Sequence, residues 1–121
     1  MTKRVLMIED QEDNRRIIRD LLTANGYEVL EATTGESGVT AAQREHPDLI
    51  LMDIQLPGID GYETTRRIKG DASLSKVPVI AVTSYALSGD DQKAFAAGCD
   101  GYVTKPFSPR ALLAKVREFL P

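Results

Sequence analysis

Three short runs of aliphatic residues constrain the fold of this chain more than any other feature. They cover residues 5–8, 49–52 and 77–82, and only Pro78 interrupts the last of them. Such a short, solidly apolar run fits a strand that is buried on both faces, as in a parallel sheet. Two weaker and more polar segments, 27–30 and 101–104, are predicted to be strands nearer the edges of the same sheet.

The segments between these runs have the spacing of helices. From Asn14 onward, one apolar stripe is formed by Ile17, Ile18, Leu21 and Leu22. Asp13 or Asn14 is predicted to cap the start of this helix, and Gly26 lies where a C-terminal glycine belongs. Further helices are predicted over residues 36–46, 61–69 and 90–97, and from Pro109 after a Ser108 cap.

Strand and helix therefore alternate five times along the chain. This alternation predicts an α/β fold, because parallel strands need helical crossovers that cover both faces of the sheet. We expect one domain over residues 1–121, with a five-stranded, doubly wound parallel sheet in the order 2-1-3-4-5. Ligands of such sheets bind at the carboxyl ends of the strands, so the residues at those ends indicate the function.

Composition excludes several classes of protein. The 121 residues are 42% hydrophobic and 27% charged, enough for one core, and the net charge of −3 argues against direct binding of nucleic acid. The single cysteine excludes an internal disulfide. The apolar runs are far shorter than the roughly 20 residues that cross a bilayer. We expect a cytoplasmic protein without a membrane segment.

Charged and hydroxyl residues follow the predicted strands. They are Glu9 and Asp10 after the first strand, Asp53 after the third, Thr83 at the fourth and Lys105 after the fifth. Three clustered carboxylates repel one another unless a cation is present, and Mg²⁺ prefers such oxygen ligands. Asp53 could then attack a phosphorus atom while the metal and Lys105 neutralise the phosphoryl oxygens.

Two other classes of protein share parts of this pattern. A flavodoxin-like electron carrier needs a loop of backbone donors for phosphate after the first strand, whereas residues 9–13 are almost entirely acidic here. A phosphatase with an aspartate nucleophile usually has a second acid two residues later, where this chain has Gln55. Both alternatives fit less well than a phosphoryl acceptor.

The motifs themselves resemble those of response regulator receiver domains of two-component signalling. They lie at residues 5–10, 49–61, 78–83 and 105–107, in the order and spacing of that family. The resemblance implies that Asp53 is the phosphoacceptor and that Glu9 and Asp10 form the acidic pocket. It also implies that Mg²⁺ is bound by Glu9, Asp10, Asp53 and the backbone carbonyl of Gln55.

The resemblance implies further roles at the fourth and fifth strands. Thr83 and Lys105 would contact the phosphoryl group, and the peptide bond between Lys105 and Pro106 would be cis. Thr83 and Tyr102 would form the switch. Gln55 and Tyr85 would flank the pocket. Glu9 stands where many members of the family have Asp, which changes the reach of this carboxylate more than its charge.

A receiver domain implies protein partners. The phosphoryl group would come from a phosphohistidine of a histidine kinase or a histidine phosphotransfer protein. The domain would assist its own phosphorylation and dephosphorylation rather than act as an enzyme on a separate substrate. Phosphorylation would change the surface of the fourth helix, fifth strand and fifth helix, with Asp91, Lys93 and Arg110 as exposed candidates for contact with a downstream protein.

Two arrangements remain open for the whole protein. It is either a stand-alone receiver, similar to single-domain cell-cycle regulators, or a receiver excised from a hybrid histidine kinase or a longer regulator. Met1 lies close to the first strand, which favours the stand-alone form. Such a receiver is expected to be a monomer or a dimer that forms on phosphorylation.

Overall fold

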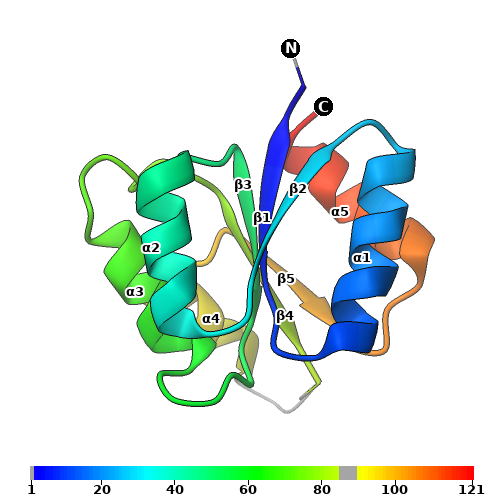
Figure 1. Cartoon of the computed structure of the whole chain (residues 1–121). Coiled ribbons are helices and arrows are strands. Elements are labelled where there is room, and N and C mark those ends of the chain that lie inside the picture. Colours follow the sequence, from blue (N-terminus) through cyan, green and yellow to red (C-terminus); the bar gives the residue numbers. More distant parts are fainter. Residues whose placement is uncertain (1, 85–89) are drawn as a thin grey trace.

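Five parallel strands alternate with five helices in the computed structural model, which describes residues 2–84 and 90–121 (Figure 1). The elements are β1 (Arg4–Ile8), α1 (Glu12–Ala24), β2 (Glu28–Ala32), α2 (Gly35–Glu45), β3 (Leu49–Asp53), α3 (Gly61–Lys69), β4 (Val79–Thr83), α4 (Asp90–Ala97), β5 (Gly101–Thr104) and α5 (Pro109–Phe119). The predicted alternation is therefore confirmed, and the helix predicted over 61–69 has the predicted bounds.

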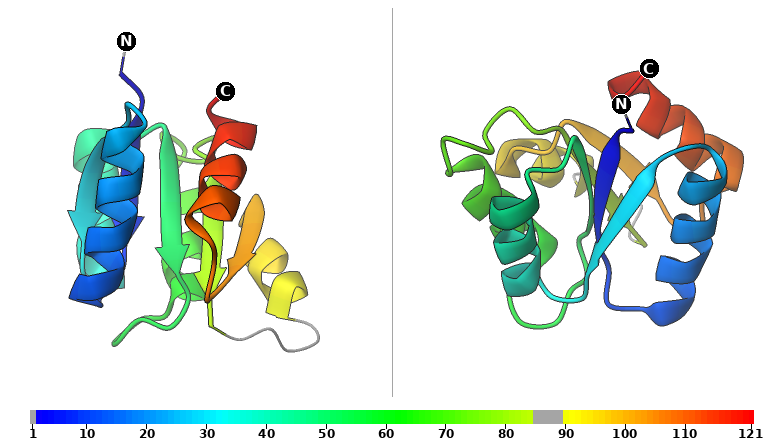
Figure 2. Two further views of the ribbon diagram at one scale, coloured as in Figure 1. Left: turned by 90° about the vertical axis from the view of Figure 1, so that its right-hand side faces the viewer. Right: turned by 45° about the horizontal axis from the view of Figure 1, so that its top comes forward.

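The strands form one sheet in the order β2-β1-β3-β4-β5, and every neighbouring pair is parallel. Figures 1 and 2 show α1 and α5 on one face of this sheet and α2, α3 and α4 on the other. The predicted doubly wound fold is thus confirmed. The carboxyl ends of all five strands lie at one edge, at the bottom of Figure 1.

The central strands are apolar throughout because each of their faces lies against a layer of helices. Along β1, Leu6 and Ile8 belong to the core cluster with α2, α3 and α4, while Val5 and Met7 belong to the cluster with α1 and α5. All the residues of β3 and β4 are buried. This burial explains why the sequence shows continuous apolar runs instead of alternation.

Several predicted boundaries were wrong: β2 covers Glu28–Ala32 instead of 27–30, and α2 covers Gly35–Glu45 instead of 36–46. Helix α1 begins at Glu12 after Gln11, so neither Asp13 nor Asn14 caps it. Glu12 and Asp13 instead lie in the first turn, where acidic side chains interact favourably with the positive end of the helix dipole. Strand β4 starts at Val79, after Pro78, which has no N–H to donate to the ladder.

Other local predictions are confirmed. The Ser108 side chain accepts a hydrogen bond from the Ala111 N–H and caps α5, with Pro109 in the first turn. Gly26 has a φ of 89°, the left-handed conformation that follows a helix and favours glycine. Among the described helices, none combines the length and the apolar character that crossing a membrane requires.

Candidate functional site

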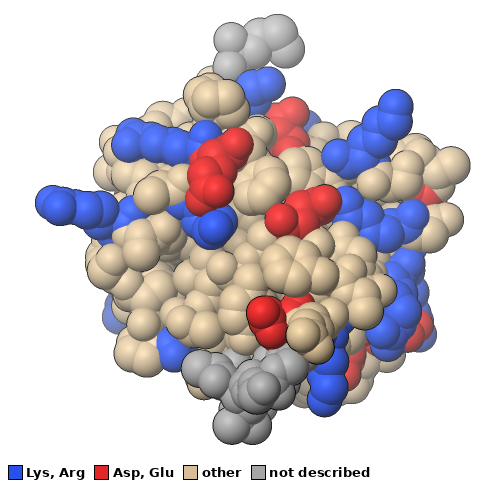
Figure 3. Space-filling view, turned by 180° about the vertical axis from the view of Figure 1, so that it is seen from behind, with Lys and Arg blue, Asp and Glu red and all other residues tan. Residues whose placement is uncertain are grey.

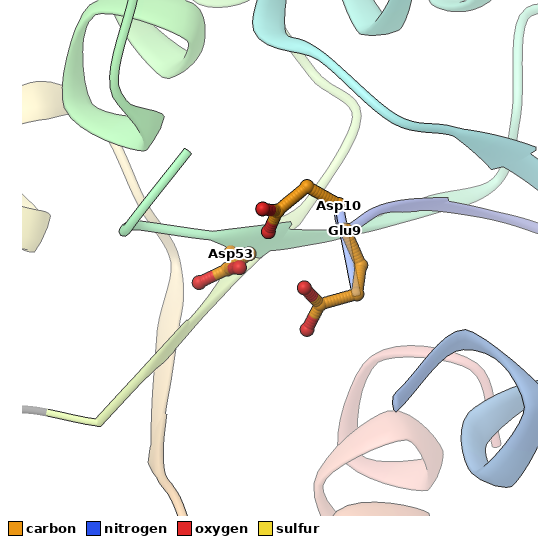
Figure 4. A group of neighbouring side chains, drawn as sticks. All are labelled: Glu9, Asp10 and Asp53. Atoms are coloured by element: carbon orange, nitrogen blue, oxygen red, sulfur yellow. The ribbon is translucent and has the colours of Figure 1, made fainter. Parts of the chain in front are cut away.

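Three carboxylates meet where β1 and β3 end. Glu9 and Asp10 follow β1, Asp53 is the last residue of β3, and one carboxylate oxygen from each lies within 4.8 Å of the others (Figure 4). Glu9 and Asp53 are only 2% and 4% exposed, and Asp10 is partly buried. The topology brings these residues together because neighbouring parallel strands end at the same edge of the sheet.

The backbone around Asp53 is held closely. Gly61 begins α3 against this strand end, where a Cβ atom would lie 2.5 Å from the Asp53 carbonyl oxygen and 2.6 Å from the Ile54 Cα. Only glycine fits this approach. The Gln55 N–H donates to Asp53 Oδ1 over 3.1 Å, and the Ile54 N–H donates to the Val82 carbonyl over 3.0 Å. The loop after β3 therefore fixes both the backbone and the carboxylate of Asp53.

Lys105 is the cation at this cluster among the described residues. Its Nζ donates to Glu9 Oε1 over 2.9 Å and lies 3.6 Å from Asp53 Oδ1. The peptide bond between Lys105 and Pro106 is cis. Glu9 Oε2 also accepts the Gln11 N–H over 3.1 Å. Glu9 is thus the closer carboxylate to the lysine, a pairing that its longer side chain permits and that the residue pattern did not predict.

Burial and crowding change the acidity of the two buried carboxyls. Burial and the neighbouring Glu9 raise the pKa of Asp53 to about 7. Burial also opposes the ionisation of Glu9, but hydrogen bonds with Asp53, Lys105 and the Gln11 N–H together lower the pKa of Glu9 below its ordinary 4.5. The site therefore has more carboxyl groups than the single positive charge of Lys105 can neutralise. A hard divalent cation with oxygen ligands fits this donor set.

Thr83 and Gln55 form a second contact beside the acids. Thr83 ends β4 and is 1% exposed. The Gln55 Nε2 donates to Thr83 Oγ1 over 2.6 Å, and Gln55 Oε1 accepts the Ser84 N–H over 3.0 Å. The resemblance implied that Gln55 flanks the pocket and binds metal through its backbone carbonyl, but it did not predict these contacts of the side chain. No motif or period in the sequence signals them.

Tyr102 lies on β5, an edge strand of the sheet. It pairs with Ala81 in the sheet and packs, half-buried, against the core cluster on the side of α2, α3 and α4. Tyr85, the other residue predicted to flank the pocket, lies outside the described residues.

The face formed by α4, β5 and α5 has exposed charged and aromatic residues. Asp91, Lys93 and Arg110 are exposed, as expected, and Phe95 is 50% exposed. Figure 3 views the molecule from the side of β5 and shows Lys and Arg side chains toward both sides, with uncharged surface and several Asp and Glu side chains between them. This face thus offers apolar and charged groups side by side.

Comparison with known proteins agrees with this geometry. Residues 5–117 match the response regulator receiver domain family. The polar-differentiation response regulator DivK of Brucella ovis is 42% identical over 120 residues, which cover 99% of this chain and 98% of that protein.

Solved structures are similar over the same length. The receiver domain of a sensor histidine kinase from Pseudomonas aeruginosa, with a magnesium ion coordinated in its active-site cleft, is 35% identical with a TM-score of 0.92, covering 99% of this chain and 98% of that one. The chemotaxis response regulator CheY4 of Vibrio cholerae is 26% identical with a TM-score of 0.93, covering 98% and 99%.

Fold, strand-end acids and sequence similarity over nearly the whole chain lead to one conclusion. The protein is a signalling regulator rather than a classical enzyme. The chain belongs to the response regulator receiver domain family of two-component signalling.

Proposed function

We propose that this chain is a phosphoacceptor switch whose Asp53 receives a phosphoryl group from a phosphohistidine of a histidine kinase or a histidine phosphotransfer protein. The observation that carries the proposal is the buried Asp53 carboxylate beside two further acids and Lys105. Glu9, Asp10, Asp53 and the backbone carbonyl of Gln55 would hold Mg²⁺. When bound, Mg²⁺ neutralises negative charge on the carboxylates and on phosphoryl oxygens.

The reaction uses Asp53 as the nucleophile. One of its carboxylate oxygens forms a bond to phosphorus while the bond between phosphorus and the donor imidazole nitrogen breaks, and the electron pair stays on the imidazole. Lys105 Nζ lies 3.6 Å from Asp53 Oδ1 and can neutralise charge on the transferred group. Thr83 can donate its hydroxyl to a phosphoryl oxygen. Positioning and electrostatics thus supply most of the catalysis.

Phosphorylation would then change the surface of α4, β5 and α5. The modification replaces the singly charged carboxylate of Asp53 with a phosphoryl group that carries roughly −1.5 to −2 charges, and it adds three acceptor oxygens next to Thr83 and Lys105. Movement of Thr83 toward these oxygens would open space for Tyr102 to turn inward, and the exposed residues of the three elements would meet a downstream protein. Dimerisation through the same face is the alternative response, with the resting protein a monomer.

We also propose a stand-alone, cytoplasmic regulator over residues 1–121. The match to DivK over 98% of that protein's length supports this arrangement. The runner-up is a receiver taken from a hybrid kinase, which the similarity to the receiver domain of a sensor histidine kinase supports. Partners would therefore be proteins, without direct contact with nucleic acid or membrane.

The test of the phosphoacceptor is intact mass after incubation with acetyl phosphate, with and without Mg²⁺. We expect a gain of one phosphoryl group that requires Mg²⁺ and is absent in Asp53→Asn. Labelling of Asp53→Asn to the wild-type level would show that another residue accepts the group. Lack of labelling of the wild type by both acetyl phosphate and phosphohistidine donors would exclude the function.

The test of the switch is Lys105→Ala. This variant is expected to accept the phosphoryl group slowly and, once labelled, to leave the NMR amide signals of β5 unchanged. In the wild type, the same signals are expected to shift on labelling. If the β5 amide signals of labelled Lys105→Ala shifted as they do in the wild type, Lys105 would have no role in transmitting the change from Asp53 to β5.

A further inference from the structure

The side chain of Gln55 contacts one acceptor and one donor at the end of β4. Its Nε2 donates to Thr83 Oγ1 over 2.6 Å, and its Oε1 accepts the Ser84 N–H over 3.0 Å. One planar carboxamide therefore makes two bonds of opposite polarity to consecutive residues, 28 and 29 positions away in the sequence. Two such bonds fix the orientation of the amide and tie the loop after β3 to the end of β4.

The backbone of the same residue is attached to the phosphoacceptor. The Gln55 N–H donates to Asp53 Oδ1 over 3.1 Å. Gln55 thus contacts Asp53 through its main chain and Thr83 and Ser84 through its side chain. A phosphoryl group on Asp53 would disturb the main-chain contact and compete with Gln55 Oε1 for the Ser84 N–H.

The competition follows from hydrogen-bonding capacity. A phosphoryl group brings acceptor oxygens that need donors, and the Thr83 hydroxyl and the Ser84 N–H lie at the neighbouring strand end. In the resting structure the Gln55 Oε1 is already the acceptor for the Ser84 N–H. Charged phosphoryl oxygens are stronger acceptors than an amide oxygen, so the exchange favours the phosphorylated state but first requires the amide contacts to break.

We infer that Gln55 is a positioning residue that acts as a latch on the unphosphorylated state. Its carboxamide keeps Thr83 and Ser84 in their resting positions and releases them only when a phosphoryl group on Asp53 takes the Ser84 N–H and draws the Thr83 hydroxyl toward its own oxygens. This inference rests on the proposed phosphoacceptor function and adds the residue that sets how readily the site changes state.

The experiment compares Gln55→Met with the wild type, and Gln43→Met is the matched control. Methionine has nearly the length of glutamine but cannot make the two bonds, and the substitution leaves the backbone carbonyl of Gln55 in place. Gln43 lies exposed on α2, where its side chain contacts Asp71. Gln55→Ala serves as a second variant, because it removes the same contacts with a smaller side chain.

The first readout needs neither metal nor phosphoryl group. In metal-free protein, the Ser84 amide proton of both Gln55 variants is expected to shift upfield and to exchange faster with solvent than in the wild type. The second readout is the affinity for beryllofluoride, a phosphoryl mimic, at saturating Mg²⁺. Loss of the two contacts is expected to tighten its binding roughly five- to tenfold, while Gln43→Met binds like the wild type.

Each outcome is informative about a different claim. Unchanged or weaker binding of beryllofluoride by both Gln55 variants overturns the latch, because the side chain then assists the phosphorylated state or takes no part in it. An unchanged Ser84 amide also overturns it. Failure of the proposed function would show separately, as absence of beryllofluoride binding and of phosphoryl uptake in the wild type itself.

Discussion

The amino and carboxyl ends of the strands differ in how their charged side chains are paired. At the amino ends of the strands, Arg4 forms ion pairs with Glu28 and Glu45, at 3.1 and 3.6 Å, and Lys69 lies 2.9 Å from Asp100. At the carboxyl ends, Lys105 contacts two of the three acids. We call the first end, with two cations for three acids, the balanced end, and the second, with one cation for three acids, the unbalanced end.

The difference separates structural charge from functional charge. Acids at the amino ends have a cation partner or accept a backbone N–H, as Asp100 does from Val79 over 2.9 Å. Those contacts connect elements and stabilise the fold. At the carboxyl ends, burial and the neighbouring Glu9 raise the pKa of Asp53, so that the ionisation of this carboxyl opposes folding. The charged residues at the amino ends of the strands thus stabilise the fold, whereas those at the carboxyl ends form the candidate binding site.

The largest effect on stability is expected from Lys69→Met at the balanced end. Lys69 Nζ donates to Asp100 over 2.9 Å, to the Val77 carbonyl over 2.7 Å and to the Ser75 carbonyl over 3.3 Å, and these three bonds would be lost while the apolar stem remains. The free energy of unfolding should fall by about 2 kcal/mol, measured by urea denaturation. An unchanged midpoint would show that this end does not stabilise the fold.

A smaller effect of opposite sign is expected at the unbalanced end. In protein treated with EDTA, Asp53→Asn should raise the free energy of unfolding by roughly 1–2 kcal/mol at pH 8, because an amide replaces a buried carboxylate beside Glu9. The comparison is made by urea denaturation at several pH values.

The pH dependence of that gain follows from the raised pKa of Asp53 of about 7. Below pH 3.8 the wild-type carboxyl is protonated in both the folded and the unfolded chain, so the variant has no advantage. Between pH 3.8 and 7 the unfolded carboxyl loses its proton first, and wild-type stability falls. The gain from Asn should grow over this range and then level off. A gain independent of pH would contradict the explanation.

The fold and the gathering of the acids followed from the sequence for a physical reason. A strand buried on both faces has to be apolar throughout, so β1, β3 and β4 are visible as runs, and parallel strands must end at one edge. Hence the sequence alone predicts that Glu9, Asp10 and Asp53 lie together. The start of α1 was misplaced because Gln11 is a weak capping residue and Asp13 a strong one, whereas the chain leaving β1 turns earlier.

The contacts within the site were harder to predict because they depend on reach and on rotamers. No pattern of residue types indicates that Lys105 lies nearer to Glu9 than to Asp53, or that the Gln55 side chain spans Thr83 and Ser84. Both contacts would be lost if one of the side chains were shorter by one or two bonds. The roles of these residues in phosphoryl transfer remain predictions that the variants test.

The smallest expected effect, and the sharpest test of the unbalanced end, is Glu9→Asp. The shorter side chain cannot keep the 2.9 Å contact with Lys105, so a metal ion no longer competes with the lysine for this carboxylate. Mg²⁺ should bind roughly three- to tenfold more tightly. Because the chain has no tryptophan, the affinity is best measured by calorimetry or NMR titration. Glu118→Asp, at an exposed position on α5, is the control. Weaker binding by Glu9→Asp would mean that the metal needs the longer reach of glutamate, and the contact with Lys105 would then be a minor competitor at a site already shaped for the ion.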